Sequence, residues 1–314
     1  MNNHKNLKTI VVIDKEEAFC ASLSKVFVPG SFVVLRAQTA EKALELIEKS
    51  RPLVIFSDTD ILESYGFSIL EKIYSGYPSV SHILMSSGDI DCYIPLIRKY
   101  NISNIIKKDS DITAFKTDTY IRSLAEGVIF GLEKYFDKCA IKKEHIIDYY
   151  QARSVCSAIS GHYPGKGALF LEIAVDELIS NALFHGVLQL TGIPRERWCR
   201  EYRLNSNDAI AVRWAVDDTK IGVSVEDPRG ILSKRQALYW MDRTSKLSCE
   251  KDEEHGRGLH LVRTLVDRFI INIDSGKRTE CLILHYLSRS GESREKPVLI
   301  NQLGNCLPNQ VNIT

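Results

Sequence analysis

Several features that direct a chain to membranes, to secretion or to nucleic acids are absent from this sequence. No apolar run approaches the roughly 20 residues that a membrane-spanning helix needs. The start, MNNHKNLKTI, lacks the apolar core of a signal peptide. The 41 basic and 40 acidic side chains leave a formal charge of +1, which gives no electrostatic reason to expect nucleic acid or an anionic membrane as a partner. We therefore expect a cytoplasmic protein that binds neither.

The eight cysteines are scattered, and no two of them form the C-x-x-C pair that is typical of zinc sites. Free cysteines of a reduced, cytosolic protein act as small hydrophobic residues. Internal repeats, low-complexity segments and Pro/Gly/Ser-rich spacers are also missing. The length of 314 residues favours two domains. Without a flexible spacer, we expect a stiff helical connection between them.

Residues 1–122 alternate short apolar runs with helical patterns. The strand-like runs lie at 9–13, 31–37, 53–57, 82–86 and 104–108. Between them, TAEKALELIEKS (39–50) places Ala43, Leu44 and Ile47 on one face, as an amphipathic helix does. Short apolar strands separated by such helices predict an α/β fold, a doubly wound five-stranded parallel sheet with helices on both sides.

Four polar side chains come at the carboxyl ends of these strands, where chemistry gathers in a doubly wound sheet. Asp14 follows the first strand and Asp58 the third. Ser86 ends the fourth strand and Lys108 lies on the fifth. Two carboxylates can hold Mg²⁺, and a carboxylate, a hydroxyl and an ammonium can receive and steady a phosphoryl group. The pattern therefore predicts one crevice suited to phosphoryl chemistry.

The stretch VIFSDTDILESYGF resembles the third-strand segment of the receiver domains of bacterial response regulators, and the likeness covers residues 8–125. The resemblance implies that Asp58 accepts a phosphoryl group from an upstream histidine kinase in two-component signalling. It also implies that Asp14 and Asp58 bind Mg²⁺, beside the receiver pocket residues Ser86 and Lys108. Lys15 stands where receivers usually carry the acid that binds the metal directly. A receiver fold that only docks or dimerises is therefore the alternative.

The stretch DELISNALFHG (176–186) sets three polar residues on an otherwise apolar helix. Glu177, Asn181 and His185 are four residues apart, so they lie along one helix face. Each alone is consistent with a solvent-facing position, and His185 equally with capping or packing. Three in register indicate a site.

Later motifs follow in a fixed order. AIAVRWAV and IGVSVED predict a hairpin that ends at Asp227. Gly256 and Gly258 open the amphipathic helix HGRGLHLVRTLVDRF, where backbone N–H groups can approach phosphates. A last hairpin, FIINI with CLILHYL, carries Thr279 in its turn segment. An asparagine oxygen such as that of Asn181 is a good ligand for Mg²⁺ between ATP phosphates.

This order of motifs resembles the Bergerat-type, histidine-kinase-like ATPase fold, an α/β sandwich. The phrases ELISNALFHG, VEDPRG, GRGLHLVRTLVDRF and GKRTE look most like its anti-sigma-factor serine kinase branch. In that resemblance Glu177 is the catalytic base that takes the proton from a Ser or Thr hydroxyl. The other implied roles are ATP binding by Asn181 (with Mg²⁺), Asp227, Gly230, Gly256, Gly258 and Thr279. A histidine kinase is disfavoured because the neighbours of His145 do not resemble a phosphoacceptor motif.

The resemblances together predict a bacterial ATP-dependent protein serine/threonine kinase, gated by a receiver domain through the helices of 112–150. Its implied substrate is an anti-sigma-factor antagonist of the STAS type, a sigma factor is a second candidate partner, and a homodimer is expected. The alternative is a non-catalytic ATP-binding switch that sequesters a sigma factor or antagonist, motivated by Lys15 and by Arg229, which stands at a usual glycine position.

We expect four segments along the chain. Residues 1–122 form the receiver-like domain, 123–145 a helical linker, 146–288 the ATPase or kinase domain, and 289–314 a loosely held tail. The stretch 187–206 reads as an insertion, either a partner-docking element or a plain surface loop.

Overall fold

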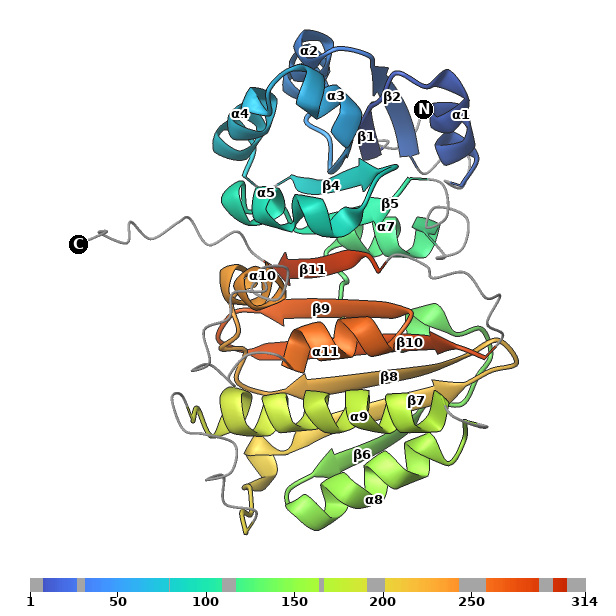
Figure 1. Cartoon of the computed structure of the whole chain (residues 1–314), viewed down its shortest axis with the longest axis vertical. Coiled ribbons are helices and arrows are strands. Elements are labelled where there is room, and N and C mark those ends of the chain that lie inside the picture. Colours follow the sequence, from blue (N-terminus) through green and yellow to red (C-terminus); the bar gives the residue numbers. More distant parts are fainter. Residues whose placement is uncertain are drawn as a thin grey trace, which may run out of the picture.

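The computed structural model of the chain describes residues 8–26, 32–78, 80–108, 117–163, 167–190, 201–242, 258–287 and 296–303. The strands are β1 (Lys8–Ile13), β2 (Phe32–Ala37), β3 (Val54–Asp58), β4 (Ser81–Ser86), β5 (Asn104–Lys107), β6 (Lys142–Ile146), β7 (Ile210–Val216), β8 (Lys220–Asp227), β9 (Arg268–Asp274), β10 (Arg278–Tyr286) and β11 (Val298–Leu303). Across the described ranges they form one eleven-stranded sheet in the order β2-β1-β3-β4-β5-β11-β9-β10-β8-β7-β6 (Figure 1).

The described helices of the N-terminal half are α1 (Glu17–Val26), α2 (Ala40–Ser50), α3 (Thr59–Ser64), α4 (Ser68–Gly76), η1 (Ile90–Tyr93), α5 (Ile94–Lys99) and α7 (Thr117–Glu126). Those of the C-terminal half are η2 (Glu133–Tyr135), α8 (Tyr149–Ser160), α9 (Gly167–Ser180), η3 (Asn181–Val187), η5 (Ser206–Asp208), α10 (Lys234–Asp242) and α11 (Gly258–Leu265). None of the helices in the described ranges has the length and apolar character that a membrane crossing requires.

The first five strands pair in parallel in the order β2-β1-β3-β4-β5. Helices α2 to α5 share the hydrophobic core on one face, and α1 and α7 share that on the other. Helix α2 begins after Thr39, whose hydroxyl accepts a hydrogen bond from the Lys42 amide, and it buries Ala40, Ala43 and Ile47. This confirms the predicted doubly wound parallel sheet.

The C-terminal half combines antiparallel strands with a helix layer on one face. Strands β6, β7, β8, β10 and β9 pair antiparallel, and α8, α9 and α11 lie in front of them in Figure 1. Alternation along β8 turns Ile221, Val223 and Val225 into the core under these helices. Asp227 is the next residue in that series, so it ends the strand on the helix side. The predicted α/β sandwich is confirmed.

The segment expected as a tail, 289–314, contains a buried strand. Val298, Leu299 and Ile300 are fully buried in β11, which pairs antiparallel with β5 and parallel with β9. The expectation of a loose tail is therefore wrong for Val298–Leu303. An apolar run of three residues among polar neighbours is too short to predict a strand from the sequence. The strands that pair with it also lie far away in the sequence. This strand makes the two halves share one sheet.

The connection expected to be helical, 123–145, is helical only at its start. The helix α7 ends at Glu126, after which Gly127 and Gly131 adopt positive φ angles of 70° and 105°. Glycine tolerates these angles and interrupts the helix. The chain then crosses the back of the sheet, where Phe136 fills the space left by Gly222, and enters β6.

A buried chain of polar groups fastens this connection and β11 to the sheet. The Tyr120 hydroxyl lies 2.7 Å from Asn301 Oδ1 and 3.0 Å from Asn104 Oδ1. The Asn301 amide donates to Asn272, whose own amide donates to Glu280 at 2.9 Å. Glu280, fully buried, also accepts from the Gly131 amide. These bonds link β5, α7, β11, β9 and β10.

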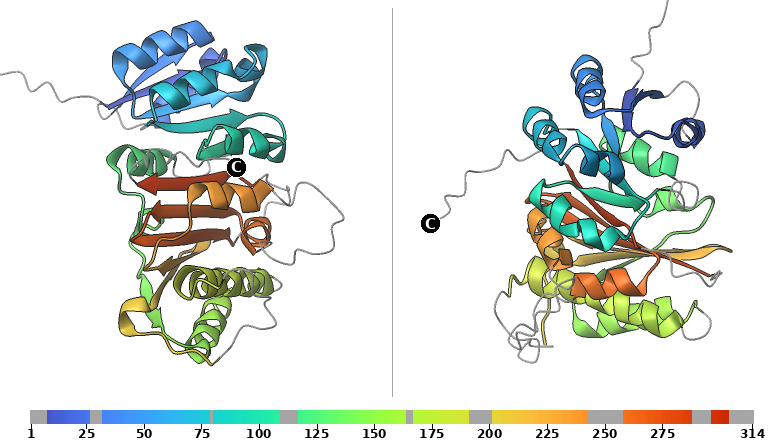
Figure 2. Two further views of the ribbon diagram at one scale, coloured as in Figure 1. Left: turned by 90° about the vertical axis from the view of Figure 1, so that its left-hand side faces the viewer. Right: turned by 45° about the horizontal axis from the view of Figure 1, so that its top comes forward.

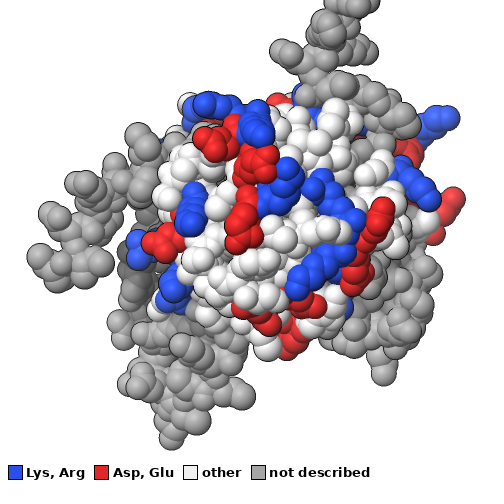
Figure 3. All heavy atoms as spheres, turned by 90° about the horizontal axis from the view of Figure 1, so that it is seen from above, with Lys and Arg blue, Asp and Glu red and all other residues white. Residues whose placement is uncertain are grey.

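Charged side chains of both signs alternate over the end of the molecule formed by the N-terminal half (Figure 3). No large patch of one sign covers the part of this face that Figure 3 colours. The view agrees with the balanced charge of the sequence.

Candidate functional site

The four polar residues predicted for the N-terminal crevice meet in the structure. The Lys108 ammonium lies 2.6 Å from Asp58 Oδ2 and 3.0 Å from Asp14 Oδ2. All three side chains are almost fully buried at the carboxyl edge of the parallel sheet. Ser86, also buried, accepts a hydrogen bond from the Gly88 amide at 3.1 Å. The structure thus brings these residues together at one edge of the sheet, where Lys108 directly follows β5 and its amide bonds to the Ser86 carbonyl at 3.0 Å. Their role in phosphoryl chemistry stays a prediction.

In this pocket one cation, Lys108, lies among the carboxylates of Asp14 and Asp58. Burial raises the pKa of Asp14, against the lowering effect of the Glu16 amide and of Lys108. Burial disfavours the charged form of Lys108, but its hydrogen bonds to Asp58 and Asp14 outweigh that cost and raise its pKa. Glu16, which sequence reasoning did not assign, adds a third carboxylate 3.3 Å from the ammonium.

The pocket does not fit a resident metal ion as it stands. The described residues contain no group of three or more His, Cys, Asp or Glu side chains that could hold one. The Lys108 ammonium takes the space between the two buried carboxylates, and Lys15 is exposed. Binding of Mg²⁺ by Asp14 and Asp58 therefore stays a prediction.

The second site starts on helix α9, which buries Leu171, Ala174 and Leu178 against the sheet. From Asn181 to Val187 the α-helix widens into a π-helix, with a hydrogen bond from the Leu188 amide to the Leu183 carbonyl at 2.8 Å. Such π turns are frequent at functional sites. At the end of this wider turn, Gly186 lies against Asp227.

Two glycines bring the predicted ATP-site residues together. A Cβ on Gly258 would lie 2.8 Å from Glu177 Oε2 and 3.1 Å from Asn181 Nδ2. A Cβ on Gly186 would lie 3.0 Å from Asp227 Cγ. Helix α11 therefore begins beside the acid and the amide, while the end of the π turn abuts Asp227. Sequence reasoning did not single out Gly186, although the motif NALFHG contains it.

Asp227 is a buried residue at the end of β8. Its Oδ1 accepts hydrogen bonds from the amides of Arg229 at 3.0 Å and Gly230 at 2.9 Å. Burial raises the pKa of Asp227, and these two amide bonds work against that rise. Thr279 is its direct neighbour on β10. Gly230 has φ +60°, and a Cβ there would lie 2.5 Å from the Asp274 carbonyl oxygen, so only glycine fits.

The residues present fit a nucleotide with Mg²⁺. Asn181 Nδ2 is a buried polar atom without a hydrogen-bond partner among the described residues. Such atoms are costly unless a ligand or water satisfies them. Because Gly186 and Gly258 lack side chains, their backbone can approach Asp227 and Asn181 more closely than any other residue would allow. Gly256 and half of the predicted insertion 187–206 lie outside the described residues.

Arg229, the residue at a usual glycine position, is engaged at the surface. Its guanidinium lies 2.6 Å from Asp208 Oδ1 and its side chain is 47% exposed. An arginine held by this ion pair contributes no unpaired charge to the nucleotide space.

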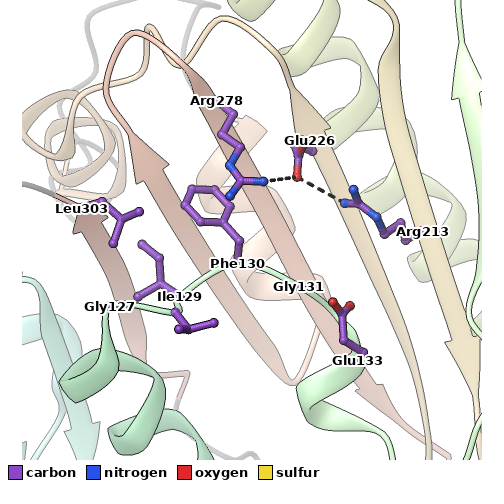
Figure 4. A pocket seen from close by; sticks show the side chains of 10 residues that line it. Gly127, Ile129, Phe130, Gly131, Glu133, Arg213, Glu226, Arg278 and Leu303 are labelled. Carbon is purple, nitrogen blue, oxygen red and sulfur yellow. Dashed lines mark hydrogen bonds and ion pairs between the residues drawn. The ribbon is translucent and has the colours of Figure 1, made fainter.

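A cavity of about 330 Å³ opens on the opposite face of the sheet, between the α7–β6 connection and strands β7, β8 and β10 (Figure 4). Arg213 and Arg278 both pair with Glu226, at 3.2 and 3.6 Å, and the Arg278 guanidinium stacks on Phe130. Glu226 precedes Asp227, so their side chains point to opposite faces. The charges of Arg213, Glu226 and Arg278 are thus paired with one another, and the cavity lies on the other face of the sheet from the predicted nucleotide site.

Parts of the chain are similar to known proteins. Residues 148–285 match the family model of the histidine kinase-like ATPase domain. The chain is 27% identical over 113 residues to the transcriptional regulatory protein DegU of Brevibacillus brevis, covering 35% of this chain and 48% of that relative. The chain thus spans about half the length of this curated relative.

Solved structures similar to part of the chain include a response regulator from Thermotoga maritima, 14% identical with a TM-score of 0.34, covering 38% of this chain and 98% of that one. The receiver domain of the stress response regulator RcsB from Escherichia coli is also 14% identical, with a TM-score of 0.34, covering 38% of this chain and 95% of that one.

Proposed function

We propose that this chain, which joins a receiver-like N-terminal domain to a histidine-kinase-like ATPase domain, is an ATP-dependent protein serine/threonine kinase of the anti-sigma switch type. The observation that carries the proposal is the position of Glu177. Its carboxylate lies beside Gly258 at the start of α11, one helical turn before Asn181. A domain that only binds ATP does not need an acid there.

The residues divide the work of phosphoryl transfer as follows. Mg²⁺, when bound with ATP, neutralises the charge that develops on the phosphates, and Asn181 is the side chain that would hold it. Asp227 accepts a hydrogen bond from the adenine amino group, and Thr279 lines the same end. Glu177 takes the proton from a Ser or Thr hydroxyl of the partner while that oxygen bonds to the γ-phosphorus. The bond from that phosphorus to the bridging oxygen breaks, and ADP leaves.

The substrate we propose is a STAS-type antagonist of an anti-sigma factor, following the resemblance of the helix motif to that kinase branch. The N-terminal pocket then serves as the input, with Asp58 as the phosphoacceptor for an upstream histidine kinase. A small phosphodonor with Mg²⁺ tests this input: a mass gain of one phosphoryl group that Asp58→Asn abolishes supports it. No mass gain would leave a receiver fold that only docks.

The kinase activity is tested with γ-labelled MgATP and STAS-type proteins from the same genome. We expect acid-stable label on a partner serine or threonine, and no label with Glu177→Ala. Label that is lost in acid and resides on the chain itself would instead indicate a histidine kinase.

A non-catalytic switch is the second candidate, favoured by Lys15 at the usual acid position and by the Lys108 ammonium between the two carboxylates. In that case the protein sequesters a sigma factor or an antagonist, with ATP as a structural ligand. Saturable MgATP binding with no transfer to any partner would favour this candidate.

A further inference from the structure

The receiver-like half touches the ATPase half beyond the shared sheet, through α5 against α10 and η1 against α11 (Figure 2). Lys234 of α10 donates hydrogen bonds to the Asn101 carbonyl at 2.6 Å and to Ser103 Oγ at 3.1 Å. Burial in this contact lowers the pKa of Lys234 to about 8. The Arg98 guanidinium lies over the ring of Tyr239, 5.3 Å from its centre.

One ion pair in this contact involves a buried guanidinium group. Arg263 of α11 donates to Asp91 Oδ1 at 2.7 Å and also to the Lys296 carbonyl. The Arg263 side chain is only 5% exposed, whereas that of Asp91 is 48% exposed. A buried guanidinium needs its partner, because an unpaired buried charge is strongly destabilising. The position of Arg263 is therefore tied to that of Asp91.

Asp91, in turn, is connected to the N-terminal pocket. Asp91 belongs to the short segment that connects Ser86, a pocket residue, to Tyr93. Asp89 fixes the Asp91 amide with a 3.0 Å hydrogen bond, and the Tyr93 hydroxyl donates to Glu63 of α3 at 2.7 Å. Because α3 starts directly after Asp58, both ends of the segment are held by elements that surround the pocket. A rearrangement at Asp58 therefore displaces Asp91.

Helix α11 carries a displacement of Arg263 to the nucleotide site. Gly258 is the first residue of α11 and precedes Arg263 by five residues, roughly 7 Å along the helix axis. Gly258 lies against Glu177 Oε2 and Asn181 Nδ2 with no room for a Cβ. A short helix moves as a unit, so a shift at Arg263 changes the spacing between Gly258 and these two side chains.

We propose that Arg263 is a positioning residue of the ATP site, and that its ion pair with Asp91 transmits the state of the Asp14–Asp58–Lys108 pocket to Glu177 and Asn181. The pair acts through α11 and touches no substrate. The assignment of Glu177 and Asn181 to ATP chemistry rests on the proposed function. The receiver thus controls the kinase by a direct contact between the domains, alongside the α7–β6 connection.

The test is a double-mutant cycle in the full chain with Asp58→Asn and Asp91→Asn. The readout is the Kd of a fluorescent ATP analogue with Mg²⁺, measured for the wild type, both single variants and the double variant. We expect Asp58→Asn alone to change this Kd by at least about fivefold, the lower end of couplings between sites in allosteric proteins. In the Asp91→Asn background the same substitution should change the Kd by less than about twofold, because the tie is cut.

Two controls separate transmission from a general structural role. Glu71→Gln removes an exposed acid from α4 of the same domain and should leave the effect of Asp58→Asn intact. Arg263→Lys keeps the charge but removes the guanidinium nitrogen that donates both to Asp91 and to the Lys296 carbonyl. It should also weaken the coupling, which keeps the test decisive if Asp91→Asn unfolds. Equal Kd changes in both backgrounds, or no effect of Asp58→Asn on the Kd, would overturn the proposal.

The outcome is independent of phosphate transfer. Coupled nucleotide binding without transfer to any partner would reject the proposed kinase and keep this inference. Transfer to a partner with additive Kd changes would keep the kinase and reject this inference.

Discussion

Replacing Gly258 by alanine should affect the stability of the fold and the rate of phosphate transfer differently. The added Cβ would stand 2.8 Å from Glu177 Oε2, which is 0.6 Å closer than the shortest ordinary contact of 3.4 Å. The carboxylate is the far end of a flexible side chain, so it moves while the backbone stays. Alanine is also a better helix former than glycine by up to about 1 kcal/mol, and Gly258 is the first residue of α11.

We therefore expect opposite signs for the two effects of Gly258→Ala. The free energy of unfolding stays the same or rises by up to about 1 kcal/mol. Phosphate transfer falls by about tenfold or more, because a misplacement of about 1 Å at a reacting group costs on the order of a hundredfold. Urea unfolding and single-turnover transfer to the partner protein measure the two effects.

The matched control is Gly76→Ala at the end of α4, where nothing lies within 4 Å of the position of a Cβ. That variant should transfer phosphate at the rate of the wild type. A folded Gly258→Ala protein with an undiminished rate would refute the reasoning, because Gly258 would then not border the catalytic acid.

Three further predictions concern stability. Burial lowers the pKa of His82 to about 3, below its usual 6.5, so the unfolded chain binds the extra proton between these values. The free energy of unfolding is therefore unaffected by His82 above pH 6.5 and decreases as the pH falls, by about 2 kcal/mol at pH 5. In urea unfolding, the free energy of unfolding of His82→Gln should depend less on pH than that of the wild type. Gly230→Ala should destabilise by more than about 2 kcal/mol in the same assay, because an L side chain at φ +60° is strained and its Cβ would meet backbone 2.5 Å away; unchanged stability would contradict the tight turn. Lys108→Met should cost about 3–5 kcal/mol at pH 7, because it leaves Asp14 and Asp58 buried without their cation. Burial raises the pKa of Asp14, so lowering the pH toward 4 should narrow the difference from the wild type as Asp14 takes up a proton.

The features that could be predicted from the sequence are those that depend on residues close together in the chain. Apolar runs of strand length and amphipathic helices between them fixed the parallel half, and the strand ends then placed Asp14, Asp58, Ser86 and Lys108 in one pocket. The motif around Asn181 likewise led to the second site, because residues four apart share a helix face.

Long-range pairing was beyond the same reasoning. The strand Val298–Leu303 pairs with residues near Ile105 and Ile270, and no local pattern announces partners so distant in the chain. The π turn after Ser180 was not predicted either, because a spacing of four residues between Asn181 and His185 is that of an ordinary α-helix. The linker was misjudged because its composition is helical, although two glycines with positive φ end the helix.

The most direct test of the account compares Glu177→Gln with Glu172→Gln, an acid on the same helix whose charged neighbour is Arg153 at 4.0 Å. The measurement is the single-turnover rate of γ-phosphoryl transfer to the partner, with the Kd of MgATP determined in parallel. The account predicts a rate about 10²- to 10⁴-fold lower for Glu177→Gln with the Kd nearly unchanged, and a rate like that of the wild type for Glu172→Gln. Equal rates for Glu177→Gln and the wild type would contradict the assignment of Glu177 as the catalytic base.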